Sequence, residues 1–185
     1  GLMGTTLIFY FSGLSIAAVA KTAHDVVLEV RQQFQERPEI LQWTAKPDYE
    51  RCVAIVTAAA LKEMSLPGTM AVATPAAVGV LFRIVGYFTD RPMLGAEALA
   101  SFLMFCTITG IVMALFFDNV GGAWDNAKKY IEAGNFGGKG SEAHKAAITG
   151  DCVGDPTKDT AGPSLHVVVK LTSTVAILLA PALVG

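Results

Sequence analysis

Aspartate and lysine side chains alternate in the last third of this sequence at spacings that suit a helix. Asp125, Lys128 and Lys129 stand at positions i, i+3 and i+4, so a helix places them on one face. Carboxylates bind divalent metal ions, and lysine ammonium groups bind phosphate as point charges. The spacing suits either a metal–phosphate site or a solvated helix face with internal ion pairs, and spacing alone leaves both open.

A second polar group follows about twenty-five residues later. Asp151, Asp155 and Asp159 succeed one another at intervals of four, with Lys158 beside the last. Carboxylates at this spacing repel one another by about 0.2–0.5 kcal/mol per pair on a helix. A divalent cation offsets that repulsion better than the lysines alone, and Mg²⁺ is usually held by one or two carboxylates together with substrate phosphates. The alternation therefore predicts a metal–phosphate site, with the solvated helix face as the alternative.

Lys170 is the single charge in the apolar stretch 165–184. Eleven residues separate it from Asp159, which is about three helical turns and roughly 16 Å, so an α-helix places both on nearly the same face. A lysine inside a bilayer costs about 2.5–3.5 kcal/mol on insertion scales and is a functional hypothesis by default. A snorkelling or merely paired lysine is the alternative. His166 falls on the same face, where a packing role and a proton-carrying role both stay open.

Four apolar blocks must position these side chains: residues 2–20, 68–88, 98–117 and 165–184. Each approaches the roughly 20 residues needed to cross a hydrocarbon core. Charged residues make up only 16% of the chain, against about 25% in a typical soluble domain. A soluble bundle would also need polar outer stripes, and the first and third blocks have almost none. We expect an all-α, polytopic transmembrane helical bundle with helices at about 2–36, 48–89, 95–133 and 142–184.

Lysine and arginine are concentrated in the connections 21–67 and 118–164, whereas the short connection between the second and third blocks holds only Arg91. Positively charged connections stay on the cytoplasmic side, so these two should be cytoplasmic. The helices should extend beyond the bilayer there, with Asp48 as the N-cap of the second helix. Pro67 should kink that helix at the membrane surface.

Other features exclude whole classes of function. The net charge of −2 gives no basic footprint for nucleic acid. Cys52, Cys106 and Cys152 have no metal-type spacing and form no even framework, so we expect reduced, structural thiols. The chain opens at Gly1 inside an apolar block without a charged leader, which is not a signal peptide pattern and predicts that its beginning is missing.

Several motifs resemble the membrane-bound, ion-pumping inorganic pyrophosphatases. They are GGAWDNAKKYIE at 121–132, HKAAITGDCVGDPTKDTAGPSLHVVVK at 144–170, TAKPDYERC at 44–52 and KEMSLPG at 62–68. The resemblance covers the whole chain and implies hydrolysis of Mg-pyrophosphate coupled to pumping of H⁺ or Na⁺. It also implies a homodimer of long subunits whose C-terminal helices this chain resembles. A multi-pass location follows, in a vacuolar or acidocalcisomal endomembrane or a prokaryotic cell membrane.

The resemblance implies roles for individual residues. In GGAWDNAKK, Asp125 is similar to a Mg²⁺ ligand and Lys128 to a pyrophosphate-binding lysine. In GDPTKD, Asp155 resembles a second Mg²⁺ ligand and Lys158 another phosphate-binding lysine. Asp159 resembles the aspartate that holds the attacking water, so it is the candidate catalytic residue.

Further positions complete the expected site. Asp151 resembles a supporting carboxylate close to the metal, and Lys129 is a further candidate for binding phosphate. Lys170 resembles the lysine of an ion gate below the hydrolytic centre. The family often has a neutral polar residue where this chain has His166, and Asp118 is atypical, so neither is assigned.

The implied cofactor is Mg²⁺, with K⁺ as a candidate activator. The implied partners are pyrophosphate, the remaining N-terminal helices, a second copy of the enzyme and membrane lipid. Those earlier helices would supply further metal ligands and most of the ion gate, so the chain alone is expected to be inactive. A secondary transporter with broken midplane helices is one alternative, although the carboxylates here cluster at one membrane face. A non-catalytic membrane subunit is another.

Overall fold

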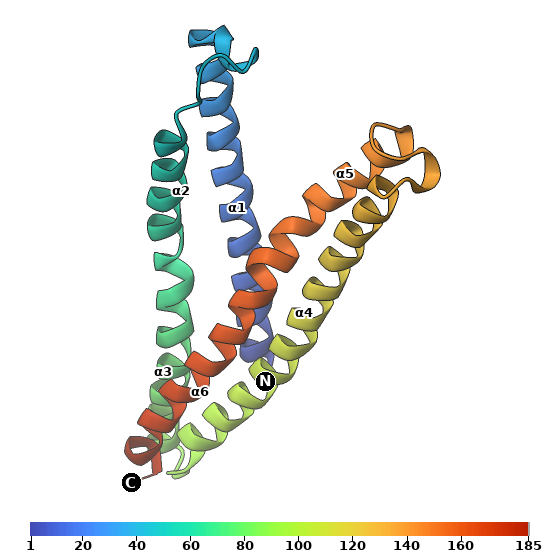
Figure 1. The fold of residues 1–185 in the computed structure, drawn as a ribbon. Helices are drawn as coiled ribbons and strands as arrows, with labels where there is room; N and C mark the ends of the chain where they lie inside the picture. Colours follow the sequence, from blue (N-terminus) through green and yellow to red (C-terminus); the bar gives the residue numbers. More distant parts are fainter. Residues whose placement is uncertain (185) are drawn as a thin grey trace.

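The computed structural model describes residues 1–184, and within that range the regular elements are all helical (Figure 1). Four helical runs are long and apolar enough to cross a membrane: Leu2–Glu36, Tyr49–Phe88, Leu94–Glu132 and Glu142–Val184. These findings confirm the all-α class and the four membrane-spanning helices expected from the apolar blocks.

The runs form two helical hairpins. The first consists of α1 (Leu2–Glu36), α2 (Tyr49–Glu63) and α3 (Ser65–Phe88), and the second of α4 (Leu94–Glu132), α5 (Glu142–Asp155) and α6 (Gly162–Val184). Short 3-10 helices, η1 (Pro38–Ile40) and η2 (Asn135–Gly137), lie in the hairpin connections, and a π-helical segment, η3 (Pro156–Ala161), joins α5 to α6. The hairpins converge where α3 turns into α4 and diverge toward η1 and η2 (Figure 1).

The core lies where α1, α4 and α6 pack together. Ile8, Phe102 and Leu165 come from these three helices, and each is at most 1% exposed. A Cβ at Gly4 would clash with the carbonyl oxygen of Phe102, so the close contact between α1 and α4 requires glycine at that position. Small residues at such crossings let helices associate in membranes by close packing. Many large apolar side chains elsewhere are exposed, which suits contact with lipid or with further helices.

The second membrane-spanning run is interrupted just before its apolar block. α2 ends at Glu63 and α3 begins at Ser65, with Met64 between them. Pro67 lacks the amide that would donate to the carbonyl of Glu63, and it is tolerated because it lies in the first turn of α3. The interruption expected around Pro67 therefore lies about one turn earlier.

Beyond the apolar zone, the side chain of Gln33 joins α1 to the start of α2. Its Oε1 accepts from the Asp48 amide at 2.8 Å, and its Nε2 donates to the Asp48 carbonyl at 3.0 Å and to Glu29 Oε1 at 2.8 Å. Glu29 also lies 3.2 Å from the guanidinium of Arg51. Asp48 Oδ1 accepts from the Arg51 amide at 3.1 Å, which confirms the predicted N-cap. The amide of Gln33 thus fixes the register of the first hairpin.

Replacing Gln33 should loosen this connection selectively. Gln33→Ala leaves a partly buried backbone amide and carbonyl without partners, a loss of about 1–3 kcal/mol. Hydrogen exchange at residues 48–52 of the full-length protein should therefore accelerate roughly tenfold or more. Gln32→Ala is the matched control, because Gln32 is exposed and bonds Glu36 on its own helix. Equal exchange in the two variants would contradict the role given to Gln33.

Candidate functional site

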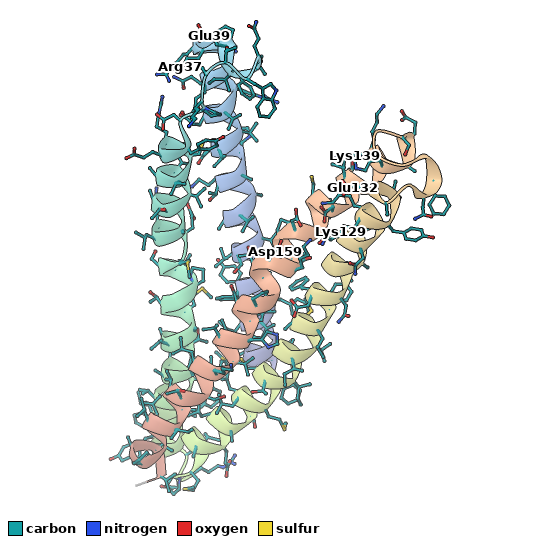
Figure 2. All side chains as sticks on the ribbon, in the orientation of Figure 1. Arg37, Glu39, Lys129, Glu132, Lys139 and Asp159 are labelled. Atoms are coloured by element: carbon teal, nitrogen blue, oxygen red, sulfur yellow. The ribbon has the colours of Figure 1, made fainter. Side chains whose placement is uncertain are left out.

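Six charged residues from three consecutive elements meet where α4 and α5 run side by side. We call them the aspartate–lysine cluster. α4 contributes the first three, α5 the next two and η3 the last. In Figure 2 the labelled Lys129 marks the position of the cluster along α4, between the hairpin connection and the crossing with α1. The members are Asp125, Lys128, Lys129, Asp151, Asp155 and Lys158.

The ammonium group of Lys158 lies at the centre of the cluster. Its Nζ is 2.8 Å from Asp155 Oδ1, 3.0 Å from Asp125 Oδ2 and 3.3 Å from Asp151 Oδ1. The side chain of Lys158 is only 15% exposed. One positive charge therefore holds three carboxylates that come from two different helices.

Two further lysines complete the charge balance. Lys128 Nζ contacts Asp151 Oδ2 across the hairpin and lies 3.5 Å from Asp125 Oδ1. Lys129 Nζ lies 2.8 Å from Asp125 Oδ2, with its side chain largely exposed. Three aspartates and three lysines make the cluster formally neutral, so an incoming anion would compete with the carboxylates for the lysines.

The ion pairs shift the protonation equilibria within the cluster. Lys129 and Lys158 hold the pKa of Asp125 well below its ordinary value, and Lys128 lowers the pKa of Asp151. Burial alone would lower the pKa of Lys158, but hydrogen bonds to the three carboxylates raise it above its ordinary value. Asp125, Lys128, Asp151 and Lys158 are therefore held in their charged forms, as a site for a metal and a polyanion requires.

Glycines allow α4 and α5 to approach closely enough for these contacts. A Cβ at Gly121 would lie 2.6 Å from the carbonyl oxygen of Gly154, and a Cβ at Gly150 would clash with the ring of Trp124. The i, i+4 spacing of Gly150 and Gly154 is a small-residue packing pattern. That pattern was the available signal for the crossing, and the spacing of the charged residues does not reveal it.

A polar contact at the hairpin connection supports the same geometry. His144 is buried, and its Nε2 lies 2.9 Å from Glu132 Oε1 while its Nδ1 accepts from the Gly140 amide at 3.1 Å. Ser141 Oγ accepts from the His144 amide at 3.1 Å, so Ser141 caps α5. His144 lowers the pKa of Glu132. Sequence reasoning assigned nothing to His144, because Glu132 lies across a turn whose geometry the sequence does not reveal.

Asp159 stands apart from the cluster, contrary to the expectation that it would join it. It lies on η3, is exposed, and forms no ion pair with any described residue. It lines a groove of about 560 Å³ between the two hairpins, together with Phe11, Glu63, Pro67 and Val167. Figure 2 places Asp159 below Lys129, at the level where the second hairpin crosses α1. The candidate water-holding carboxylate therefore faces this groove, whereas Lys158, the preceding residue, contacts the cluster carboxylates.

The π-helical turn alters the angular position of Asp159 relative to His166 and Lys170, which both lie in the regular helix α6. A constant α-helical increment of about 100° per residue aligned Asp159, His166 and Lys170, but η3 has a wider turn. His166 points toward Asp118 of α4, with Nε2 3.5 Å from Asp118 Oδ2. Lys170 is exposed, and no ion pair joins it to another residue in 1–184. Asp159, by contrast, faces the groove.

The donor chemistry of the cluster fits a hard divalent cation. Among residues 1–184, no group of three His, Cys, Asp or Glu side chains is arranged closely enough to hold a metal ion. The three cysteines are free thiols. The three cluster carboxylates nevertheless reach a common positive charge, the Lys158 ammonium. Oxygen ligands of this kind suit Mg²⁺, which keeps positions open for water and phosphate. The metal roles of Asp125, Asp151 and Asp155 remain predictions.

The sequence profile of the family described as inorganic H⁺ pyrophosphatase matches residues 1–179. The chain belongs to this family. It is 60% identical over 181 residues, 98% of its length, to the pyrophosphate-energized membrane proton pump 3 of Arabidopsis thaliana, and covers 23% of that protein. It is 59% identical to the K⁺-insensitive pyrophosphate-energized proton pump 2 of Moorella thermoacetica, over 94% of this chain and 24% of that protein.

A third relative has a different ion in its name. The chain is 50% identical to the putative K⁺-stimulated pyrophosphate-energized sodium pump of Bacteroides thetaiotaomicron, over 96% of this chain and 23% of that protein. The chain thus spans about a quarter of the length of the curated relatives it matches. Membership of this family and the four spans make it an integral, multi-pass membrane protein.

Removing the central lysine should turn the cluster into a stronger cation site. Lys158→Met leaves three carboxylates facing one another, so the full-length protein should melt several degrees lower in the absence of divalent ions. Mg²⁺ can then occupy the centre, so the rise in Tm on adding Mg²⁺ should exceed that of the unmutated protein. Lys145→Met is the control, because Lys145 pairs only with the exposed Glu142. A smaller Mg²⁺-induced rise in the Lys158 variant would refute the central position of this ammonium.

Proposed function

We propose that the full-length protein containing this chain hydrolyses Mg-pyrophosphate and couples the reaction to movement of H⁺ or Na⁺ across a membrane. One observation carries the proposal: a cluster of ion-paired aspartates and lysines, equal in number, lies beyond the ends of the apolar spans. The names of the matched relatives, all of them pyrophosphate-energized pumps, agree with it.

The cluster residues divide into two roles. Lys128, Lys129 and Lys158 exchange their carboxylate partners for phosphate oxygens when pyrophosphate binds. Asp125 and Asp155, supported by Asp151, then direct their freed oxygens to the magnesium ions of the substrate. Bound Mg²⁺ would neutralise charge on the phosphates and stabilise the leaving phosphate. The lysines are aimed in advance by the helices that hold them, so their reorientation on binding is small.

Asp159 orients and deprotonates the attacking water in this proposal. Its carboxylate is not neutralised by the cluster lysines, so it is free to accept a proton. The groove that it lines lies between the hairpins and is bounded by the apolar residues of α1 and α3. A helix from the remaining three quarters of the protein would close this groove and bring a second carboxylate to the same water.

Lys170 serves the ion path in the same proposal. It lies within the apolar part of α6, and an uncompensated lysine there is costly. Its partner is an acidic side chain from the remaining helices, since no residue in 1–184 pairs with it. Asp151, Asp155 and Lys158 of the cluster lie on the same helical run as this lysine, which links the chemistry to the path.

The assembly is part of the proposal as well. The full-length protein forms a homodimer in contact with lipid, with the connections 21–67 and 118–164 on the cytoplasmic side. K⁺ remains a candidate activator, because both K⁺-insensitive and K⁺-stimulated pumps occur among the relatives. A secondary transporter would need its charges at the midplane, whereas the cluster lies beyond the apolar blocks.

Asp159→Asn should abolish hydrolysis while leaving substrate binding largely intact. The amide can still accept a hydrogen bond from water but cannot take its proton, a loss of about 10²–10⁴-fold in phosphate release. Binding of Mg-pyrophosphate, measured as protection from thermal unfolding, should stay near that of the unmutated protein. Asp25→Asn, at an exposed position of α1, is the control. Near-normal turnover of the Asp159 variant would exclude its role as the base.

Lys170→Ala should impair pumping at least as severely as hydrolysis. The substitution leaves the buried acidic partner unpaired and favours its neutral form. The measurement is the ratio of ion transport to phosphate release in sealed vesicles. If both rates and their ratio match those of the unmutated protein, Lys170 is only a structural residue.

A further inference from the structure

Two residues without a role in the proposed chemistry contact each other between α4 and α6, the two long helices of the second hairpin. Asp118 lies on α4 and His166 on α6, and His166 Nε2 is 3.5 Å from Asp118 Oδ2. Their side chains are 38% and 49% exposed within this chain. Both lie at the cytoplasmic edge of the apolar blocks, below the aspartate–lysine cluster and above Lys170 along α6.

The packing shows that the Asp118 carboxylate occupies a specific space. A Cβ at Gly162 would clash with Asp118 Oδ1, so the carboxylate lies in the space that a side chain at 162 would fill. The backbone carbonyl of Thr157 borders the same space. Asp118 is therefore inserted against the first turn of α6, directly after the π-helical segment, and is held near His166 by the backbone of two helices.

The charges around this contact are few. On α6 and η3, Lys170 stands one turn after His166, Asp159 stands seven residues before it, and Lys158, eight residues before it, is already paired with the cluster carboxylates. α1 carries no charge over residues 2–20. From α3, Arg83 donates to the Leu183 carbonyl at 2.6 Å, which is the far end of α6. Asp125 is the next charge along α4 and is already paired with Lys129 and Lys158. Asp118 is therefore the carboxylate that faces His166.

We propose that Asp118 and His166 form a binding site for one proton between the hydrolytic cluster and Lys170. This inference rests on the proposed function. The contact favours the His166 tautomer whose Nε2–H faces the Asp118 carboxylate, which leaves Nδ1 free to accept a proton. The proton binds at Nδ1, where the resulting imidazolium forms an ion pair with Asp118, and it leaves from the same atom.

The charge balance explains why a proton suits this place. Without the proton, the pair carries one negative charge, which the positive charge of Lys170 offsets. With the proton, the pair is neutral and Lys170 is left uncompensated unless its acidic partner approaches. Net charge is costly at the edge of an apolar layer. Occupancy of this site therefore biases how strongly Lys170 attracts its acidic partner, and this couples a proton near the cluster to the ion path.

The experiment uses the full-length protein in sealed vesicles with His166→Asn, Asp118→Asn and the double variant. Each single variant should lower the ratio of transported ions to released phosphate several-fold, while phosphate release in detergent stays within about twofold. The double variant should be no worse than either single variant, because both substitutions remove one site. His24→Asn and Asp25→Asn are the controls, since both residues are exposed and lie outside any ion pair within the described range.

A second readout needs no pyrophosphatase activity. The double-mutant cycle in Tm should give a stabilising coupling at pH 6 that disappears at pH 9, because the attraction requires a protonated imidazole. Three results would each overturn the proposal. The transport ratio could be unchanged in either single variant, the effects could multiply in the double variant, or the coupling in Tm could be equal at both pH values. If the unmutated protein releases no phosphate from pyrophosphate, the proposed function fails, and the Tm cycle still decides whether the pair binds a proton.

Discussion

The contact on which this site depends is the meeting of the Lys158 ammonium with carboxylates from two helices. Three carboxylates brought this close without a central positive charge would drive α4 and α5 apart. With Lys158 in place, each carboxylate has a partner within about 3 Å, and the glycines at 121 and 154 let the backbones approach. The arrangement is formally neutral, because three aspartates are paired with three lysines. A metal and a polyanion can enter it by exchanging partners, with no charge left uncompensated during the exchange.

Much of the fold follows from the sequence because the apolar blocks are long and their ends carry recognisable signals. The four spans, the helical extensions beyond the apolar blocks and the Asp48 cap are consequences of local pattern. The tertiary contacts that fix how neighbouring helices align do not follow from local pattern. Gln33 bonds the backbone of Asp48 fifteen residues away, and His144 meets Glu132 across a turn containing glycines with positive φ. Such contacts depend on where two helices stop, which periodicity does not determine.

The candidate site was predicted in composition but not in arrangement. Charges at i, i+3 and i+4 placed Asp125 and Lys128 on one face, and the structure joins them to Asp151 and Lys158. Asp159 was expected with them and instead faces the groove between the hairpins. Lys158 and Asp159 are adjacent on the π-helical segment η3, and adjacent residues of a helix point in different directions, so the first contacts the cluster and the second lines the groove.

The π-helical segment η3 divides the last helical run into two α-helices, α5 and α6, whose side-chain stripes are not aligned. One turn of π-helix accommodates more residues than an α-turn, so the stripe of side chains that faces α4 above residue 156 does not continue as the same stripe below residue 162. Heptad assignments, cysteine cross-links and spin-label pairs must therefore be counted separately on each side. A single-residue deletion within 156–161 would remove the extra residue of the wide turn, so the run would continue as one α-helix with its side chains in a single register.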